Sequence, residues 1–234
     1  MKIFAISDLH LSFSEDKPMD IFGSAWENYT EILYDNWQSL ICNDDLVLIP
    51  GDISWAMKLE NAAKDFEYIN RLNGKKVIIR GNHDYWWQSY SKVCEFLPEG
   101  IYALQNNCIS IGNVKLCGTR GWIFPESNSE QKEEDKKIFN REIERLKISV
   151  KKMQELREKG DIVIGMMHYP PFNTKWEDSP FTEIFNLNNI NTMVYGHIHG
   201  KNSSYKKVIK KGELSCHICS CDLLDNMPVL IGEV

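Results

Sequence analysis

Short apolar runs alternate along the chain with longer segments in which apolar residues recur at every third or fourth position. A short unbroken apolar run is typical of a buried strand, and a spacing of three and four places side chains on one face of a helix. The sequence therefore predicts strands over residues 2–7, 46–49, 76–80, 161–167 and 191–195, and helices over residues 26–40, 59–72, 89–96 and 139–153. This alternating order predicts an α/β fold with a largely parallel sheet.

The last of these helices carries a long apolar stripe, formed by Phe139, Ile143, Leu146, Val150 and Met153. We interpret it as the cover of one sheet face, since too few heptads are present for a coiled coil with a partner. The charged run over residues 130–137 predicts a solvent-exposed start of the same helix.

Shorter strands are predicted in two further regions. Residues 101–118 fit two or three short strands with a turn at Gly112-Asn113. Alternation of apolar and polar residues over 205–209, 214–221 and 229–231 predicts antiparallel strands that complete a second sheet. No internal repeat, low-complexity tract or long linker divides the chain, so residues 1–234 are predicted to form a single domain.

Composition narrows the class of protein. The chain is 43% hydrophobic and 26% charged, as in an ordinary globular protein. Its net charge of -6 argues against nucleic acid as a partner, because binding to the phosphate backbone usually needs a basic stripe. The first apolar stretch is too short for a signal peptide and no later run approaches a membrane span, which predicts a cytoplasmic protein. Seven scattered cysteines predict reduced thiols without disulfides.

Polar side chains follow the predicted strands at the points where the strands end. Because ligands in open α/β folds bind beyond the carboxyl ends of the strands, we expect these side chains to lie close together. Five of the six histidines belong to the set, which consists of Asp8, His10, Asp52, Asn82, His83, Asp84, His168, His197 and His199. A lone histidine at a strand end is usually structural, but the joint pattern favours a metal site.

The chemistry of the set indicates which metals it suits. Imidazole nitrogens mixed with carboxylate and amide oxygens suit Mn, Fe, Zn or Co, whereas calcium prefers oxygen alone and structural zinc usually takes thiolates. So many candidate ligands exceed one coordination sphere and predict two ions, which a carboxylate can bridge at a separation of about 3.5 to 4 Å. On an extended segment the rings of His197 and His199 point to the same side and could serve neighbouring ions.

Five short motifs in order resemble those of the calcineurin-like metallophosphoesterase superfamily, in particular its small single-domain bacterial-type members. They are Asp8-Leu9-His10, Gly51-Asp52, Gly81-Asn82-His83-Asp84, His168 and Gly196-His197-Ile198-His199. The resemblance implies a four-layer α/β/β/α sandwich of two mixed sheets flanked by helices, with a dimetal site at the carboxyl ends of the strands. It implies that one ion binds Asp8, His10 and His199, that the other binds Asn82, His168 and His197, and that Asp52 bridges them.

The resemblance also implies hydrolysis of a phosphomonoester or phosphodiester by a hydroxide that the two ions generate. His83 is then free of metal and is predicted to be the general acid, with Asp84 fixing its tautomer and Asn82 also touching the phosphoryl group. Two alternatives stay open, a non-catalytic metal-binding scaffold of the same fold and a nuclease. The sequence leaves open the substrate, the ester type, the native metals and the oligomeric state.

Three further features have both a functional and a structural interpretation. Arg120 lies between glycines after a predicted strand and could bind the substrate phosphate, or it could form a salt bridge. Trp86 and Trp87 could line the substrate site, although large aromatic residues mostly fill cores. The segment Cys216–Cys221 could bind zinc, but we favour a strand with small buried thiols.

Overall fold

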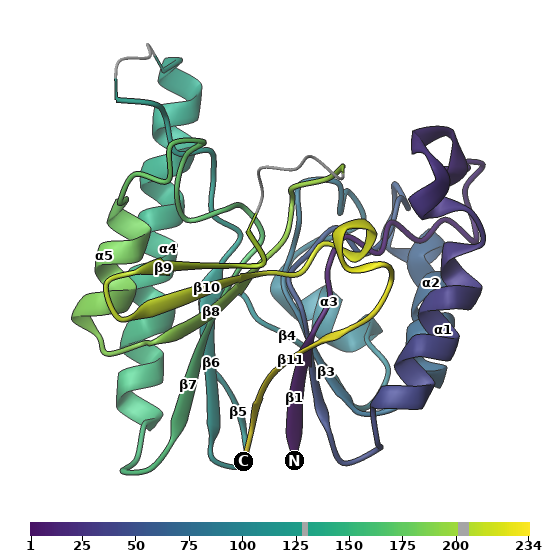
Figure 1. The fold of residues 1–234 in the computed structure, drawn as a ribbon, viewed down its shortest axis with the longest axis horizontal. Helices are drawn as coiled ribbons and strands as arrows, with labels where there is room; N and C mark the ends of the chain where they lie inside the picture. The colour runs from purple at the N-terminus through teal and green to yellow at the C-terminus, as the bar shows by residue number, and fades with distance from the viewer. Residues whose placement is uncertain (128–130, 201–205) are drawn as a thin grey trace.

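Two β-sheets lie face to face at the centre of the computed structural model, which describes residues 1–127, 131–200 and 206–234 (Figure 1). The first sheet has the strand order β11-β1-β2-β3-β4 and consists of β1 (Lys2–Ala5), β2 (Leu46–Ile49), β3 (Lys75–Ile78), β4 (Ile101–Ala103) and β11 (Val229–Glu233). Strands β1 to β4 are parallel, and β11 pairs antiparallel with β1.

The second sheet has the order β5-β6-β7-β8-β10-β9. Its strands are β5 (Ile109–Ile111), β6 (Val114–Thr119), β7 (Ile162–Met167), β8 (Thr192–Tyr195), β9 (Val208–Lys211) and β10 (Leu214–Ile218). Strands β6, β7, β8 and β10 are parallel, while β5 and β9 form antiparallel edges. Both sheets are therefore mixed, with parallel strands at their centres.

Helices cover the outer face of each sheet, on opposite sides of the molecule (Figure 1). The helices α1 (Tyr29–Leu40), α2 (Ala63–Arg71) and α3 (Tyr90–Phe96) pack on the first sheet, and α4 (Glu133–Leu156) and α5 (Pro180–Leu187) pack on the second. The structure thus confirms the predicted four-layer α/β/β/α sandwich of two mixed sheets.

Alternate residues of each central strand enter different apolar layers. In β1, Ile3 and Ala5 face the second sheet, where Leu116 and Ile164 belong to the same buried cluster. Phe4 instead joins the cluster beneath the first group of helices. A strand that is buried on both faces carries an unbroken apolar run, which is why these strands could be recognised in the sequence.

The helical stripe over residues 139–153 is confirmed in α4, where Ile143, Leu146, Val150 and Met153 are buried and Phe139 is half-buried. The helix start is mostly exposed over residues 131–137, and Glu130 lies outside the described residues.

The first helix, α1, begins at Tyr29 rather than at the predicted Trp26. Asn28 adopts a left-handed conformation there, so Trp26 lies in a separate 3₁₀ turn.

Two expectations about the last strands were wrong. The final strand, β11, does not complete the second sheet, because it pairs with the edge of β1 in the first. Strand β10 is antiparallel to β9 but parallel to β8, so it is not a purely antiparallel addition. Alternation over three to five residues predicts a strand but does not specify its partner, which depends on contacts between distant parts of the chain.

Candidate metal centre

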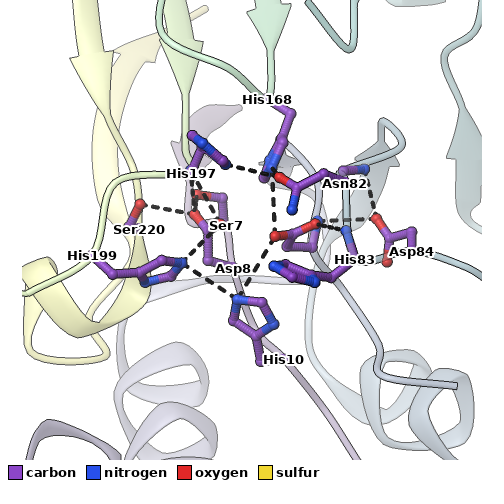
Figure 2. Close-up of polar contacts among 12 residues, drawn as sticks. Ser7, Asp8, His10, Asn82, His83, Asp84, His168, His197, His199 and Ser220 are labelled. Carbon is purple, nitrogen blue, oxygen red and sulfur yellow. Dashed lines mark hydrogen bonds and ion pairs between the residues drawn. The ribbon is translucent and has the colours of Figure 1, made fainter. Parts of the chain in front are cut away.

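The predicted site residues leave the carboxyl ends of strands from both sheets and converge between them (Figure 2). Asp8 and His10 follow β1, Asp52 follows β2, and Asn82 follows β3. The second sheet contributes the remaining predicted ligands, which are His168 after β7 and His197 and His199 after β8. Parallel pairing brings these strand ends to one edge, so residues that are far apart in the sequence become neighbours.

One group of potential ligands consists of Asp8, His10 and His199, whose donor atoms lie within 4.8 Å of one another. Nε2 of His199 lies 3.5 Å from Oδ1 of Asp8 and 3.4 Å from Nε2 of His10. The other carboxylate oxygen of Asp8 accepts hydrogen bonds from Ser7 Oγ at 2.5 Å and Ser220 Oγ at 2.8 Å. The backbone N–H of His197 donates to both oxygens, at 3.0 and 3.1 Å, so the carboxylate is held with Oδ1 close to the ring of His199.

A second group consists of Asp52, His168 and His197. Oδ1 of Asn82 joins it, 2.7 Å from Nε2 of His168 and 2.8 Å from Nδ1 of His197. Nδ1 of His168 lies 2.9 Å from the carbonyl oxygen of Pro50 and donates its proton there. In the neutral ring Nε2 is then unprotonated, so it faces the amide oxygen with a lone pair rather than with a hydrogen.

Asp52 lies between the two groups. Its Oδ1 accepts the backbone N–H of His83 at 2.7 Å. Its Oδ2 is buried and has no hydrogen-bond partner among the described residues, although it lies 3.5 Å from His168 Nε2 and 3.8 Å from His10 Nε2. Burying a carboxylate oxygen without a partner, among the lone pairs of nitrogen and oxygen atoms, costs free energy. A bound cation lowers that cost by balancing the negative charge. The residues present therefore fit two metal ions.

The pKa values of three of the predicted ligand histidines favour the neutral form that binds metal. Burial lowers the pKa of His10 and of His168 to about 3, and it lowers the pKa of His197 to about 4. Burial, together with the negative charges of Asp8 and Asp84, raises the pKa of Asp52 to about 9. Burial alone would lower the pKa of His199, but Asp222 and Asp8 outweigh it and raise that pKa to about 10. Without a cation, the site thus retains protons that a metal ion would displace.

The backbone at the site is strained. Asp8, His10, Asp52 and His197 all have left-handed backbone conformations, with φ between 45° and 72°. Such residues cost on the order of 1 to 3 kcal/mol each and cluster at functional sites. His197 is therefore not on an extended segment, as the sequence had suggested, and its ring joins the second group because the chain turns there, while His199 joins the first.

The glycines in two of the motifs are required by close packing. A Cβ added at Gly81 would collide with the carboxylate of Asp52, and one added at Gly196 would collide with the carboxylate of Asp8. Each glycine therefore lets a neighbouring loop approach a predicted ligand.

Asp84 contacts loop backbone rather than the ring of His83, with which the sequence had suggested a hydrogen bond. Its two oxygens accept five N–H groups at 2.7 to 3.2 Å, from the backbone of Gly81, Asp52, Ile53 and Ser54 and from the ring of Trp86. Nδ1 of His83 is buried and has no partner among the described residues, so the expected hydrogen bond that fixes its tautomer is missing there. Asp84 instead holds the loops after β2 and β3 together.

Sequence reasoning missed Asp222, which is almost fully buried. Its Oδ1 lies 3.0 Å from Nδ1 of His199, and its Oδ2 accepts the backbone N–H of Gly200 at 2.9 Å. A carboxylate on the far nitrogen of a ligand histidine orients the ring and raises its basicity. The residue lies after β10 in a run of ordinary composition, so no pattern in the sequence distinguishes it.

Two pockets flank the centre. One of about 660 Å³ is lined by His10, His83 and His199 together with the aromatic side chains of Phe22, Trp26 and Trp55. Trp55 stacks on His10 with ring centroids 4.9 Å apart and lies 4.5 Å from the ring of His83. The other pocket, of about 550 Å³, lies beside His197 and Tyr169, whose rings are 4.2 Å apart.

Arg120 has partners away from the ligand groups. Its guanidinium lies 3.9 Å from Glu142 and over the ring of Trp122, at 4.8 Å from the ring centroid. Its carbonyl oxygen accepts the backbone N–H of His168 at 3.1 Å, which ties β6 to the site through the main chain. Contact of the side chain with a substrate phosphate stays a prediction.

The remaining candidates are structural in the described residues. Trp86 and Trp87 are buried in the core beneath the first group of helices. In the segment Cys216–Cys221 the three cysteines are buried and unpaired, and they lie in three different apolar clusters. Neither of the metal-ligand groups found among the described residues contains a cysteine. Strand β10 ends at Ile218, so only the first part of this segment is strand.

Comparison with known proteins identifies the class that this fold and site define. Residues 1–201 match the sequence profile of the calcineurin-like phosphoesterase family, so the chain belongs to that family. A relative in Methanocaldococcus jannaschii, the uncharacterized protein MJ1445, is 31% identical over 100 residues, which are 41% of this chain and 53% of that protein. The matched region thus spans about half the length of that relative.

Two solved structures share the fold. Protein TT1561 of Thermus thermophilus is 15% identical, with a TM-score of 0.58 over 97% of this chain and 96% of that one. The phosphopantetheinyl hydrolase of Mycobacterium tuberculosis is 13% identical, with a TM-score of 0.57 over 94% of this chain and 88% of that one. Within the described residues, no helix is long and apolar enough to cross a membrane.

Proposed function

We propose that this protein hydrolyses a phosphate monoester or diester at a centre of two metal ions. The observation that carries the proposal is the buried Oδ2 of Asp52, which lies between two groups of histidine and carboxylate ligands without a hydrogen-bond partner among the described residues. Membership of the calcineurin-like phosphoesterase family supports the reaction class. Net charge and composition do not favour nucleic acid as the substrate.

In this proposal Asp8, His10 and His199 would hold one ion, Asn82, His168 and His197 would hold the other, and Asp52 would serve both. The ions would lower the pKa of a water molecule towards neutrality and neutralise charge on the phosphate. The mixed nitrogen and oxygen ligands suit Mn, Fe or Zn. Asn82 is also proposed to contact a phosphoryl oxygen, because an amide that holds an ion through Oδ1 still has its N–H groups to donate.

His83 is proposed as the general acid that protonates the leaving oxygen. Its ring belongs to neither ligand group, yet its centroid lies only 5.6 Å from that of His10, and it lines the aromatic pocket of about 660 Å³. An acid must be within hydrogen-bond reach of the oxygen that departs, so the position of His83 supports a leaving group that lies in this pocket. The aromatic walls then favour a leaving alcohol with an apolar or flat organic part.

Asp84 is proposed to act by positioning rather than by contact with His83. By accepting from the backbone of both loops, it holds the bridging Asp52 and the start of the Asn82 motif in register. Because the two ligand groups draw on both sheets, we treat residues 1–234 as one domain. A cytoplasmic location also stays a prediction.

The proposal is tested by hydrolysis of paired chromogenic phosphate monoesters and diesters after metal-stripped protein is reloaded with Mn, Fe, Zn, Co or Mg. Asp52→Asn keeps the shape of the side chain but removes the charge between the two groups, and exposed Asp44→Asn is the matched control. We expect turnover that requires metal, is lost in Asp52→Asn and is unchanged in Asp44→Asn. Two bound ions without turnover on any ester would instead support the non-catalytic scaffold.

A further inference from the structure

A small pocket of about 70 Å³ lies where β3, β4 and β6 end beside α4. Its lining includes three arginines, Arg80, Arg120 and Arg145, and a single carboxylate, Glu142. None of the proposed metal ligands lines this pocket. It is therefore a feature separate from the candidate metal centre, although Arg80 directly precedes the Gly81-Asn82-His83-Asp84 motif.

The one carboxylate of this pocket is already engaged. Glu142 is fully buried, receives a hydrogen bond from Thr119 Oγ1 at 2.5 Å and pairs with Arg145 at 2.7 Å. Its distance to the guanidinium of Arg120 is longer, 3.9 Å. Glu142 thus faces both Arg120 and Arg145, and it also lies 3.9 Å from Arg141 outside the pocket, so the pocket keeps an excess of positive charge.

Of the three arginines, Arg80 has the least negative charge nearby to balance its own positive charge. It is half-buried and has no carboxylate within ion-pair distance among the described residues. The Nε atoms of Arg80 and Arg120 are both buried without an acceptor there. Burial lowers the pKa of Arg120, and the charge of Arg80 adds to that lowering while Glu142 opposes it. Buried charges without partners are costly, so this arrangement calls for an anion.

We propose that this pocket binds a small oxyanion of the phosphate type through Arg80, Arg120 and Arg145. A guanidinium presents a planar fork of N–H donors that matches two oxygens of a phosphate. The oxyanion would complete the charge balance and join β3, β6 and α4, which come from both sheets. It is either free inorganic phosphate or a second phosphate group carried by a substrate.

Binding is tested by isothermal titration of inorganic phosphate into the metal-loaded protein and into the same protein after chelation. Arg80→Gln and Arg145→Gln each remove one donor, and Arg157→Gln is the control, because that side chain is exposed, does not line the pocket and contacts the carbonyl oxygen of Asn188 instead. We expect binding to weaken roughly tenfold in each pocket variant, as for the loss of a hydrogen bond to a charged group, and to be unchanged in the control. Binding should survive chelation.

Equal phosphate affinity in wild type and Arg80→Gln would overturn the proposal, because the phosphate would then be an adventitious ion only. Loss of all phosphate binding on chelation would also overturn it, because the phosphate would then bind the metal centre. Thermal unfolding guards against misfolded variants. Without phosphate, Arg80→Gln should unfold at the same temperature as wild type or higher, because it removes an unpaired charge. With phosphate, only wild type and Arg157→Gln should show the full rise in melting temperature.

Enzyme kinetics distinguish the two sources of the oxyanion. Only this kinetic experiment rests on the proposed function, whereas the titration does not. An alkanediol monophosphate and the matching bisphosphate are compared as substrates. A lower KM for the bisphosphate that disappears in Arg145→Gln assigns the pocket to a second phosphate of the substrate. Equal KM values, with titration still showing the pocket occupied, assign it to free phosphate. If no ester is hydrolysed at all, the proposed function fails while the titration still decides on the site.

Discussion

Replacing Asp222 by Asn tests whether this residue supports the metal centre from outside the ligand set. The carboxylate lies 3.0 Å from Nδ1 of His199, whose Nε2 faces Asp8 and His10. Asparagine has nearly the same shape and can still accept from Nδ1–H, so the ring should stay in place. What is lost is the negative charge that makes Nε2 a stronger donor to a cation.

The expected magnitude follows from similar interactions. Removing a carboxylate behind a ligand histidine typically weakens metal binding about 10- to 100-fold, or about 1.4 to 2.7 kcal/mol. A hydrogen bond to a charged group contributes about 1.5 to 3 kcal/mol, which agrees with that range. Only one of the two ions should be affected, because His199 belongs to the group of Asp8 and His10 and not to that of His168 and His197.

The assay is metal content at a series of buffered free Mn²⁺ concentrations and one fixed pH, since protons compete with metal for Nε2 of His199. Wild type should fill two sites, whereas Asp222→Asn should fill one at the wild-type concentration and the other only at a roughly 10- to 100-fold higher concentration. Exposed Asp44→Asn is again the control. Two sites with unchanged affinity in a folded Asp222→Asn protein would refute the reasoning.

Three further outcomes are expected. His83→Ala should keep both ions but lose about 10²- to 10⁴-fold in the turnover of esters with poor leaving groups. The loss should be much smaller for esters with good leaving groups, which need no proton from an acid. Equal losses on the two kinds of ester would contradict the role of His83 as general acid. Gly81→Ala should lower both metal content and melting temperature, because the new methyl group collides with Asp52, whereas Gly232→Ala, with open space around it, should change neither. Burial lowers the pKa of Lys76 from 10.5 to about 8. Between these pH values the unfolded chain binds more protons, so the free energy of unfolding should rise with pH by on the order of 3 kcal/mol, and this rise should be absent from melts of Lys76→Met.

The central strands and the set of polar residues at their ends could be predicted from local pattern, whereas the choice of seven proposed ligands within that set came from the family resemblance. Runs such as Leu46–Ile49 are apolar throughout since both faces of the strand are buried, and a polar residue directly after such a run marks the strand end. The parallel order then forces these ends together. The fold class followed from the same alternation and from the order of the motifs.

What could not be predicted depends on contacts between distant parts of the chain. The pairing of β11 with β1 is one case, since a short alternating run fits several sheet edges. The contacts of Asp84 are another case, because adjacency in the sequence suggested His83 as its partner, whereas its oxygens accept N–H groups from the loops after β2 and β3 and from Trp86. Asp222 gave no signal at all, because its function depends on the position of His199, which is 23 residues away.

Each ligand group takes side chains from both sheets, and this has a consequence for the mechanics of the fold. An ion in either group would act as a removable cross-link between segments more than 100 residues apart in the sequence, in a protein whose seven cysteines are all unpaired. Metal loading would then tighten the sandwich at the strand ends, where the pockets open, and leave the opposite edge, where both termini lie (Figure 1), unchanged. The supply of metal would therefore set the rigidity of that end of the molecule as well as its chemistry.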